Sequence, residues 1–590
     1  MVTLTIDDTS VTVEDGATIL DAAKAANISI PTLCYFKGLC DIGACRVCCV
    51  EVEGDERLSA ACNTPATEGM VVRTRSDRAE AARKTNLELI RSRHDLDCRN
   101  CVRYGTCRLQ YLLKSYGLAG PDAAPAIYPQ ELPRGKRAEW DPHAIIQRNA
   151  SRCIQCGRCV AACKKLQGIG VWEFIGTGSR SSIGVADNRT MREAGCVACG
   201  QCITHCPVGA LSERDDIARL RAAIADPEVT TVVQIAPATR TAWASSFGKQ
   251  DGELGVERMC AALKEMGVDY VFDTVFAADL TIMEEGTELL NIVKAGETDR
   301  LPLFTSCCPG WVNFARTRYP ESIAQHLSSA KSPMQMFGAV VKTWFAEKNG
   351  LAPEKIFSVA LMPCTAKKVE VALPGMSSNP GVPDMDASLT TREFARMIAQ
   401  SEIDVEALED MPLDDPLDKG TGAGVIFGTT GGVMTAALRT AAAIMTGSNP
   451  EPTGFEFAPA AEGPWKEAVF DLAGTPIRCA VVHGLANTDQ LIAALDAGTV
   501  DYDFIEVMAC PSGCAGGGGQ PIDGSDRELG FARGAVLHTL DTDAPVRFSH
   551  ENPDVQACYS EFLGAPLSPL AEELLHTDHH AWTMPNEGTC

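Results

Sequence analysis

The stretch FIEVMACPSGCAGGGGQP, residues 504–521, carries the strongest chemical signal in the chain. Its mainly apolar first five residues predict a short buried strand. Cys510 and Cys514 follow the strand, and the glycines of residues 516–519 come directly after them. Thiolates bind iron or zinc, while glycines let the backbone approach a bulky ligand and turn N–H groups toward an anion. The stretch therefore predicts a metal-binding loop, the alternative being a Gly-rich turn with two idle core cysteines.

Two other segments place cysteines directly after a predicted strand. LPLFTSCCPGW (301–311) has Cys307 and Cys308 behind one apolar run, and FSVALMPCTAKKVE (357–370) has Cys364 behind another. Binding sites of open α/β sheets form outside the carboxyl ends of the strands. The cysteines of all three segments are therefore expected to converge on one site.

These three segments resemble, nearly letter for letter and in the same order, the three signature motifs of the FeFe-hydrogenases, or iron-only hydrogenases. The resemblance extends from about residue 1 to about residue 577, and the chain looks especially like the catalytic subunit of NAD(P)-linked members. It implies an enzyme that interconverts H2 with protons and electrons. It also implies a multidomain fold of α/β and α+β units.

Length, charge and cysteine content limit the possible functions. The 590 residues suffice for several domains. Acidic residues outnumber basic ones, 77 to 52, and the net charge of −25 disfavours nucleic acid or an anionic membrane as a partner. No run of about 18 apolar residues occurs, so no membrane span is expected. The 26 cysteines without a visible signal peptide indicate metal ligation in a reducing compartment, and a cytoplasmic location is expected.

Residues 1–77 are expected to form a 2Fe–2S domain. VTLTIDDTSVTVE alternates around a turn at 7–9 and predicts a β-hairpin, and residues 18–27 predict a short helix. Four cysteines follow, spaced C-x10-C-x2-C-x13-C: Cys34, Cys45, Cys48 and Cys62. Four thiolates around an irregular loop suit a 2Fe–2S cluster, with zinc as the alternative. The segment resembles the β-grasp module of multi-cluster hydrogenases and of the large iron–sulfur subunit of respiratory complex I, and leaves Cys49 to pack within a strand.

Residues 78–139 are expected to hold a second metal site followed by a linker. Residues 79–93 have helical periodicity. The residues available for burial on this helix are Ala82, Leu87, Leu89 and Ile90. An H-x3-C-x2-C-x5-C pattern follows, formed by His94, Cys98, Cys101 and Cys107. Zinc also accepts three cysteines and one histidine, but the spacing resembles the His-ligated 4Fe–4S site of the same families. A Pro-rich connector, residues 120–142, comes next.

Residues 140–222 contain an internal repeat, in which the bacterial ferredoxin run C-x2-C-x2-C-x3-C occurs twice, offset by 43 residues. The two runs are Cys153, Cys156, Cys159, Cys163 and Cys196, Cys199, Cys202, Cys206. In such runs the fourth cysteine ligates the other cluster. Two 4Fe–4S clusters are therefore expected, with Cys206 completing the first and Cys163 the second.

Strand-like and helix-like runs alternate over residues 223–525, as in VTTVVQIAP followed by 257–266. The alternation predicts parallel sheets covered by helices, and the two-lobed α/β catalytic domain of the family fits it. Residues 526–590 resemble the family's small subunit, fused here, and are expected to form helices that wrap this domain. A glycine string at 420–424 follows an acidic loop, so it is not a dinucleotide fingerprint.

The resemblance assigns roles at the expected active site. The residues that would hold a 4Fe–4S cluster are Cys308, Cys364, Cys510 and Cys514. Cys514 would also bridge to a diiron subsite carrying CO, cyanide and dithiolate ligands, and the two parts together are the H-cluster. Lys367 would donate to one cyanide, its ordinary alternative being a surface charge. Pro237 would contact the other cyanide, and Met362 and Met508 would pack beside the diiron unit or simply within the core.

The same resemblance indicates a proton path. Cys307 would not ligate iron and would be the first proton relay. Glu285, Glu288 and Ser328 match the rest of the path, and two glutamates three residues apart share a helix face. Alone, such a pair is more often a solvated face. Some relatives have an arginine four residues after the second glutamate, where this chain has Ile292, so the outer end of the path is open.

Other functional classes remain as alternatives: a non-catalytic H2 sensor, an electron-transfer subunit like that of complex I, or an iron–sulfur assembly factor. The intact TSCCPGW motif disfavours the first, and the full glycine motif disfavours the others. Expected cofactors are one 2Fe–2S cluster, three accessory 4Fe–4S clusters and the H-cluster. Expected partners are H2, protons, maturation proteins, and ferredoxin or flavin- and NAD(P)-binding subunits, because no nucleotide motif is present. The cysteines without an established role are Cys40, Cys49, Cys260, Cys479, Cys558 and Cys590.

Overall fold

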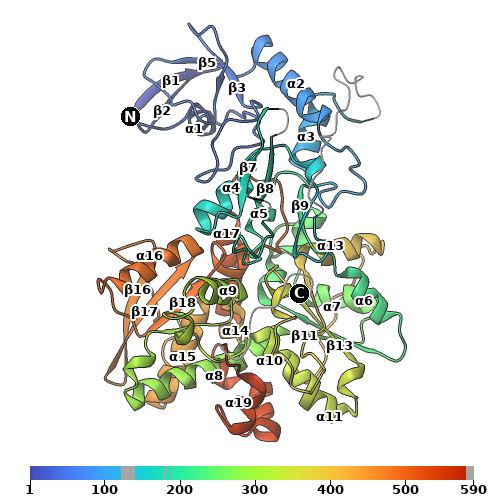
Figure 1. Ribbon diagram of the computed structural model, residues 1–590, viewed down its shortest axis with the longest axis vertical. Helices are drawn as coiled ribbons and strands as arrows, with labels where there is room; N and C mark the ends of the chain where they lie inside the picture. Colours follow the sequence, from blue (N-terminus) through green and yellow to red (C-terminus); the bar gives the residue numbers. More distant parts are fainter. Residues whose placement is uncertain (121–139, 179–180, 186, 188, 580–590) are drawn as a thin grey trace.

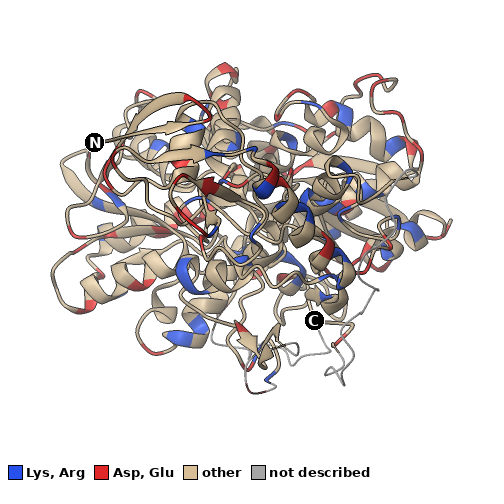
Figure 2. Cartoon of the chain, turned by 90° about the horizontal axis from the view of Figure 1, so that it is seen from above, with Lys and Arg blue, Asp and Glu red and all other residues tan. Residues whose placement is uncertain are grey.

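The computed structural model describes residues 1–120, 140–178, 181–185, 187 and 189–579. The N-terminal sheet lies at one end of the longest axis and helix α19 (Pro569–Leu575) at the other (Figure 1). Acidic and basic residues are interspersed over helices and loops (Figure 2). None of the described helices is both long and apolar enough to cross a membrane.

The first module is a five-stranded sheet with strand order β2-β1-β5-β3-β4 and one helix. Its strands are β1 (Val2–Ile6), β2 (Thr9–Val13), β3 (Cys49–Val52), β4 (Ser59–Ala60) and β5 (Val71–Arg73). β1 and β2 pair antiparallel and confirm the predicted hairpin. Helix α1 (Ile19–Ala25) begins with a capping box, in which the side chains of Thr18 and Asp21 each accept the backbone N–H of the other.

Helix α2 (Asp77–Ser92) confirms the second predicted helix. It buries Leu87 as expected, but Leu89 is 46% exposed, so that part of the prediction was wrong. Leu89 lies two positions from Leu87 and therefore on nearly the opposite side of the helix. The buried side instead includes Arg83, whose guanidinium donates to the carbonyl of Cys49 and joins α2 to the first module.

A small body with the two cysteine runs follows the Pro-rich connector, most of which lies outside the described residues. It contains two antiparallel strand pairs, β6 with β9 and β7 with β8. Helix α3 (Arg108–Ser115) precedes the connector. The elements of the small body are β6 (Ile146–Arg148), α4 (Arg158–Ala161), β7 (Trp172–Ile175), β8 (Ser182–Val185), α5 (Gln201–Thr204) and β9 (Leu211–Glu213). In Figure 1 this body lies between the N-terminal sheet and the two large sheets.

The first large sheet has the strand order β11-β10-β13-β14. Its strands are β10 (Thr230–Ile235), β11 (Tyr270–Asp273), β13 (Ile356–Met362) and β14 (Ala387–Thr390). All three pairings are parallel, as the alternation of strand and helix predicted. Parallel strands buried on both faces read as continuous apolar runs, which is why VTTVVQI was recognisable.

The second large sheet has the order β12-β18-β17-β16-β15 and is mixed. Its strands are β12 (Leu303–Phe304), β15 (Ala458–Pro459), β16 (Lys466–Leu472), β17 (Thr475–His483) and β18 (Phe504–Met508). β18 pairs parallel with β12 and β17, but β16 pairs antiparallel with β17. The expectation of purely parallel sheets was therefore wrong here, because a hairpin with a tight turn at residues 473–474 extends the sheet on its outer edge.

Helices cover both sheets and the cleft between them. Their bounds are α6 (Ile217–Ile224), α7 (Val256–Glu265), α8 (Thr274–Ala295), α9 (Pro309–Arg318), α10 (Pro333–Val340), α11 (Ala346–Asn349), α12 (Lys367–Glu370), α13 (Thr391–Gln400), α14 (Gly422–Ile426), α15 (Gly432–Thr446) and α16 (Leu485–Asp496). The 22-residue α8 packs against α10 and α15.

The C-terminal tail folds back over the catalytic lobes as α17 (Gly530–Asp543), α18 (Pro553–Cys558) and α19. Asp279 of α8 is fully buried and accepts hydrogen bonds from Thr421, Ser549 and Asn552. Because a buried carboxylate is costly without donors, this cluster fixes the tail on α8.

Candidate active site

The carboxyl ends of strands from both sheets open on one cavity of about 80 Å3. Its lining is almost wholly apolar apart from sulfur and one lysine. The predicted site residues that line it are Pro237, Cys307, Cys308, Cys364, Lys367, Met362, Met508, Cys510 and Cys514. The three cysteine segments therefore meet, although they lie about 60 to 200 residues apart in the sequence.

Among the described residues, five thiols line the cavity: Cys307, Cys308, Cys364, Cys510 and Cys514. Cys308, Cys364, Cys510 and Cys514 act on one another electrostatically, and burial raises the pKa of Cys364 to about 11, with the neighbouring Cys308 thiol adding to the shift. Burial also raises the pKa of Cys307, whose strongest charged neighbour is Glu285. Four converging thiols that become thiolates on metal binding suit an iron–sulfur cluster.

The glycines after Cys514 are required by close backbone packing. A Cβ on Gly517 would lie 2.1 Å from the carbonyl oxygen of Pro363, and one on Gly518 would lie 2.1 Å from that of Cys199. Both contacts are with backbone atoms, which a side chain cannot displace cheaply. The residues therefore fit a bulky cluster, because four sulfur donors and an apolar cradle surround the cavity while the glycine loop closes tightly beside it.

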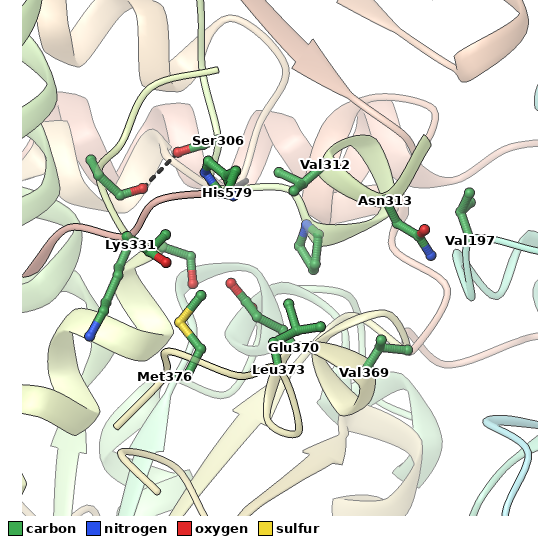
Figure 3. A pocket seen from close by; sticks show the side chains of 14 residues that line it. Val197, Ser306, Val312, Asn313, Lys331, Val369, Glu370, Leu373, Met376 and His579 are labelled. Atoms are coloured by element: carbon green, nitrogen blue, oxygen red, sulfur yellow. Dashed lines mark hydrogen bonds between the residues drawn. The ribbon is translucent and has the colours of Figure 1, made fainter. Parts of the chain in front are cut away.

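Lys367 is buried at the cavity wall. Its ammonium lies 2.6 Å from the Glu370 carboxylate and donates to the Ser332 hydroxyl at 2.7 Å and the Cys307 carbonyl at 3.2 Å. Glu370 keeps it charged and raises its pKa despite the opposing effect of burial. A cation in an otherwise apolar cavity can bind an anionic ligand. Glu370 also faces a neighbouring cavity of about 20 Å3, which Ser306, Lys331 and His579 help to line (Figure 3).

Glu285 and Glu288 are both buried on α8, and the buried Ser328 belongs to the chain segment before α10. The Ser328 hydroxyl donates to Glu288 Oε2 at 2.7 Å. The Glu285 carboxylate accepts no hydrogen bond of standard geometry from the described residues, although Ser328 and the Ser306 N–H lie close enough to offset part of its desolvation. Burial, with Glu288 as the second cause, raises the pKa of Glu285 to about 8.

Arg300 occupies the outer end of this chain of residues. Its guanidinium donates to Glu288 Oε1 at 3.1 Å, whereas Ile292 points into a hydrophobic core. The sequence analysis missed Arg300, because it lies twelve residues after Glu288 and beyond the end of α8, where helical spacing carries no information. Glu288 and Arg300 both line an open cavity of about 590 Å3.

The shifted pKa of Glu285 predicts a pH-dependent stability of the cluster-free chain. The ordinary pKa is 4.5 and the folded value about 8, so between these values the folded chain holds a proton that the unfolded chain releases. The free energy of unfolding should therefore fall as pH rises through this window. In urea unfolding, Glu285→Gln should flatten this dependence and be more stable than the parent above pH 8 by on the order of a few kcal/mol. Exposed Glu297→Gln is the control, and equal pH slopes for Glu285→Gln and the parent would contradict the prediction.

The four cysteines of the first module form two thiol pairs. A hydrogen bond from Cys45 lowers the pKa of Cys34 to about 6, and one from Cys62 lowers the pKa of Cys48 to about 7. All four face one another within the loop. Two cysteines of this module, Cys40 and Cys49, lie outside the predicted ligand set. The thiol of Cys40 donates a hydrogen bond to the Cys156 carbonyl.

His94 is buried after α2, and burial lowers its pKa to about 4. A neutral imidazole is the form that binds metal. The thiols of Cys98, Cys101 and Cys107 act on one another electrostatically. A Cβ on Gly209 would lie 2.3 Å from Cys101 Sγ, so this site packs directly against the body with the cysteine repeat.

The repeat cysteines form two groups. One cavity of about 20 Å3 is lined by Cys153, Cys156, Cys159 and Cys206. The thiol of Cys202 instead interacts electrostatically most strongly with Cys196 and Cys163, and that of Cys199 with Cys510 and Cys202. The fourth cysteine of each run thus lies with the first three of the other.

Hydrogen bonds join this second group to the catalytic cavity. Thr365 donates to the Ala198 carbonyl at 2.6 Å, and Gln201 donates to the Gly516 carbonyl at 2.9 Å. The thiol of Cys510 also points to the Cys199 carbonyl, at 3.9 Å.

Four of the remaining cysteines have ordinary core positions. Cys49 opens β3 and donates to the Ala79 carbonyl, as expected of strand packing. Cys260 and Cys479 donate to the carbonyls of Pro412 and Ile477, and Cys558 is buried. Cys590 lies outside the described residues.

Comparisons with known proteins match every segment of this description. Residues 229–518 match the family "Iron only hydrogenase large subunit, C-terminal domain", and residues 531–582 match "Iron hydrogenase small subunit". Residues 1–77 match a 2Fe–2S iron–sulfur cluster binding domain. Residues 83–121 match the iron–sulfur binding region of NADH-ubiquinone oxidoreductase G, and residues 143–212 match the ferredoxin-like domain of NADH-quinone oxidoreductase subunit 3. The chain therefore contains 2Fe–2S and 4Fe–4S binding domains next to the hydrogenase domain.

Two relatives span nearly the whole chain. NADP-reducing hydrogenase subunit HndD of Solidesulfovibrio fructosivorans is 43% identical and covers 98% of this chain and 99% of its own length. Iron hydrogenase 1 of Clostridium pasteurianum is 36% identical with the same coverage, 98% and 99%. The structure of an apo FeFe-hydrogenase from Chlamydomonas reinhardtii matches with a TM-score of 0.56 and 37% identity, covering 61% of this chain and 98% of that one. The chain therefore belongs to the FeFe-hydrogenase family and is a catalytic member with accessory iron–sulfur domains.

Proposed function

We propose that the cavity between the two sheets holds the H-cluster, with Cys308, Cys364, Cys510 and Cys514 as ligands and Cys514 as the bridge to the diiron subsite. The observation that carries this proposal is the convergence of these four thiols on one apolar cavity that Lys367 also lines. When bound, the H-cluster supplies the iron centre at which H2 is cleaved or formed. Lys367 would orient one cyanide, Pro237 would contact the other, and Met362 and Met508 would pack beside the subsite.

Protons would travel along Cys307, Glu285, Ser328 and Glu288. The pKa of Glu285, raised to about 8 by burial, suits a group that both takes and releases protons near neutrality. The hydroxyl of Ser328 already contacts Glu288 at 2.7 Å. Arg300 would hold the Glu288 carboxylate at the edge of the open cavity.

Electrons would leave by way of the accessory clusters. The ligands of the 2Fe–2S cluster would be Cys34, Cys45, Cys48 and Cys62, and those of the His-ligated 4Fe–4S cluster His94, Cys98, Cys101 and Cys107. The two remaining 4Fe–4S clusters would use the groups Cys153, Cys156, Cys159, Cys206 and Cys163, Cys196, Cys199, Cys202. Both N-terminal sites contact the first group, through Arg158 on the Cys34 carbonyl and Arg103 on the Cys206 carbonyl.

The order of these proposed cluster sites along the chain supports a division into five domains, residues 1–77, 78–139, 140–222, 223–525 and 526–590. The second group of the repeat would pass electrons to or from the H-cluster, because Cys199 adjoins Cys510.

The cluster content gives a direct count. One 2Fe–2S cluster, three accessory 4Fe–4S clusters and a six-iron H-cluster sum to about 20 iron atoms per matured chain. Iron analysis should find this value, and Cys98→Ala with Cys101→Ala should lower it by about four. Half the expected iron, with zinc in the remaining sites, would contradict the assignment.

The physiological partner would be a flavin- and NAD(P)-binding subunit or ferredoxin, in the cytoplasm. Similarity to the HndD subunit favours the former. The purified chain should therefore reduce viologen with H2 and should not reduce NAD(P), because its glycine string begins the short α14 after an acidic loop instead of following a strand. Direct NAD(P) reduction by the single chain would show that it contains a nucleotide site.

A further inference from the structure

The tail brings a histidine to the outer end of the proposed proton path. His576 follows α19 and pairs with Ala330 in an isolated antiparallel bridge. The Lys331 N–H donates to the Leu575 carbonyl, and the Thr577 N–H donates to the Ser329 carbonyl, both at 2.8 Å. These two backbone hydrogen bonds, which form the bridge, hold His576 beside the segment that carries Ser328.

The side chain of Ser329 connects this histidine to Glu288. Its hydroxyl lies 3.2 Å from Glu288 Oε1 and 2.9 Å from His576 Nδ1. A hydroxyl can donate to one of these atoms while it accepts from the other. Ser329 can therefore pass a proton between the carboxylate and the imidazole.

The other ring nitrogen faces a buried carboxylate. His576 Nε2 lies 3.0 Å from Glu284 Oε2, and Glu284 is also held by the hydroxyl of Tyr559 and the N–H of Leu567. Glu284 has 0% exposure. A fixed carboxylate beside Nε2 sets the tautomer and the orientation of the ring.

His576 opens on solvent as well. It lines the cavity of about 590 Å3 together with Glu288, Arg300, Glu572, Asp578 and His579. His579 is a less suitable relay, because its Nε2 contacts the Ser328 carbonyl oxygen, which carries no transferable proton. Among the histidines that line this cavity, His576 is therefore the one whose ring connects to the proton path, through the hydroxyl of Ser329.

We propose that Ser329 and His576 form the outermost protein relay of the proton path, beyond Glu288; this inference rests on the proposed path through Glu285 and Ser328. During H2 oxidation, the Glu288 carboxyl gives its proton to Ser329 Oγ as the hydroxyl hydrogen moves to His576 Nδ1. This leaves a Glu288 carboxylate and an imidazolium beside Glu284. The imidazolium then gives one proton to water in the cavity, so one proton enters, one leaves and no electron moves.

The test compares His576→Gln, which keeps a polar side chain but cannot carry the proton, with His550→Ala in the same tail. His550 contacts Asn449 at 2.9 Å and lies off the path. In the matured chain, His576→Gln should slow viologen-linked H2 oxidation by about tenfold or more, with an unchanged KM for viologen. Added imidazole should restore a large part of the rate, and more so at pH values where it is neutral. His550→Ala should behave like the parent.

Two further measurements separate the alternatives. The unfolding temperature of the cluster-free His576→Gln chain should match that of the parent, which excludes loss of the tail. Full activity of His576→Gln, or a loss that imidazole does not restore, would overturn the relay while leaving the inner path intact. If Glu285→Gln also keeps full activity, the proposed path itself fails.

Discussion

Replacing Cys307 by alanine should lower H2 turnover by at least about 100-fold while leaving the iron content and the CO and cyanide infrared bands unchanged. Cys307 lines the catalytic cavity and interacts electrostatically with Glu285 more strongly than with any other group, whereas Cys308 is the strongest electrostatic neighbour of Cys364. The substitution therefore removes a proton carrier and no ligand. Activity assays and infrared spectra of the same matured sample measure both effects.

Cys308→Ala is the matched control, because it removes the adjacent thiol. It should lose or distort the cluster and show reduced iron. Cys307→Asp should retain some turnover, since a carboxyl also carries a proton, although desolvation disfavours it. Iron loss in Cys307→Ala with iron retention in Cys308→Ala would reverse the two roles and contradict the mechanism.

Gly517→Ala should abolish assembly of the H-cluster. The added Cβ would lie 2.1 Å from the Pro363 oxygen and 2.8 Å from the Cys514 oxygen, so the backbone that places Cys364 and Cys514 must shift. We expect no CO or cyanide bands after maturation and about six fewer iron atoms. The accessory clusters should remain, because their ligands lie in other elements.

Gly286→Ala is the corresponding control. Gly286 is also buried, on α8, but a Cβ there would meet nothing within 4 Å. Alanine is preferred over glycine inside a helix, so this variant should assemble normally. An intact infrared spectrum for Gly517→Ala would show that the glycine loop is not needed for close packing.

The sequence allowed the central features to be predicted because they depend on local patterns. The apolar run of β18 and its two cysteines identified a strand end that opens on the cavity, and the 43-residue repeat indicated two linked groups of cysteines. The same C-x2-C-x2-C-x3-C run also predicted that its fourth cysteine lies with the first three cysteines of the other copy. These features need only short-range spacing.

The missed features depend on tertiary contacts. Strand β16 mixes polar and apolar residues and buries only its last residue, Leu472, so it gives little sequence signal of its own. Arg300 meets Glu288 only because the chain turns back after α8, and His576 reaches Ser329 only because the tail pairs with residue 330. Leu89 was expected to be buried because it is apolar, but it lies on the side of α2 that faces solvent.

Infrared spectroscopy of the matured chain tests the H-cluster assignment most directly, since iron-bound CO and cyanide have no other source in this protein. We predict bands of both ligands, which disappear in Cys514→Ala while the accessory clusters remain. A matured chain with its accessory clusters and full H2 turnover but without CO and cyanide bands would contradict the assignment.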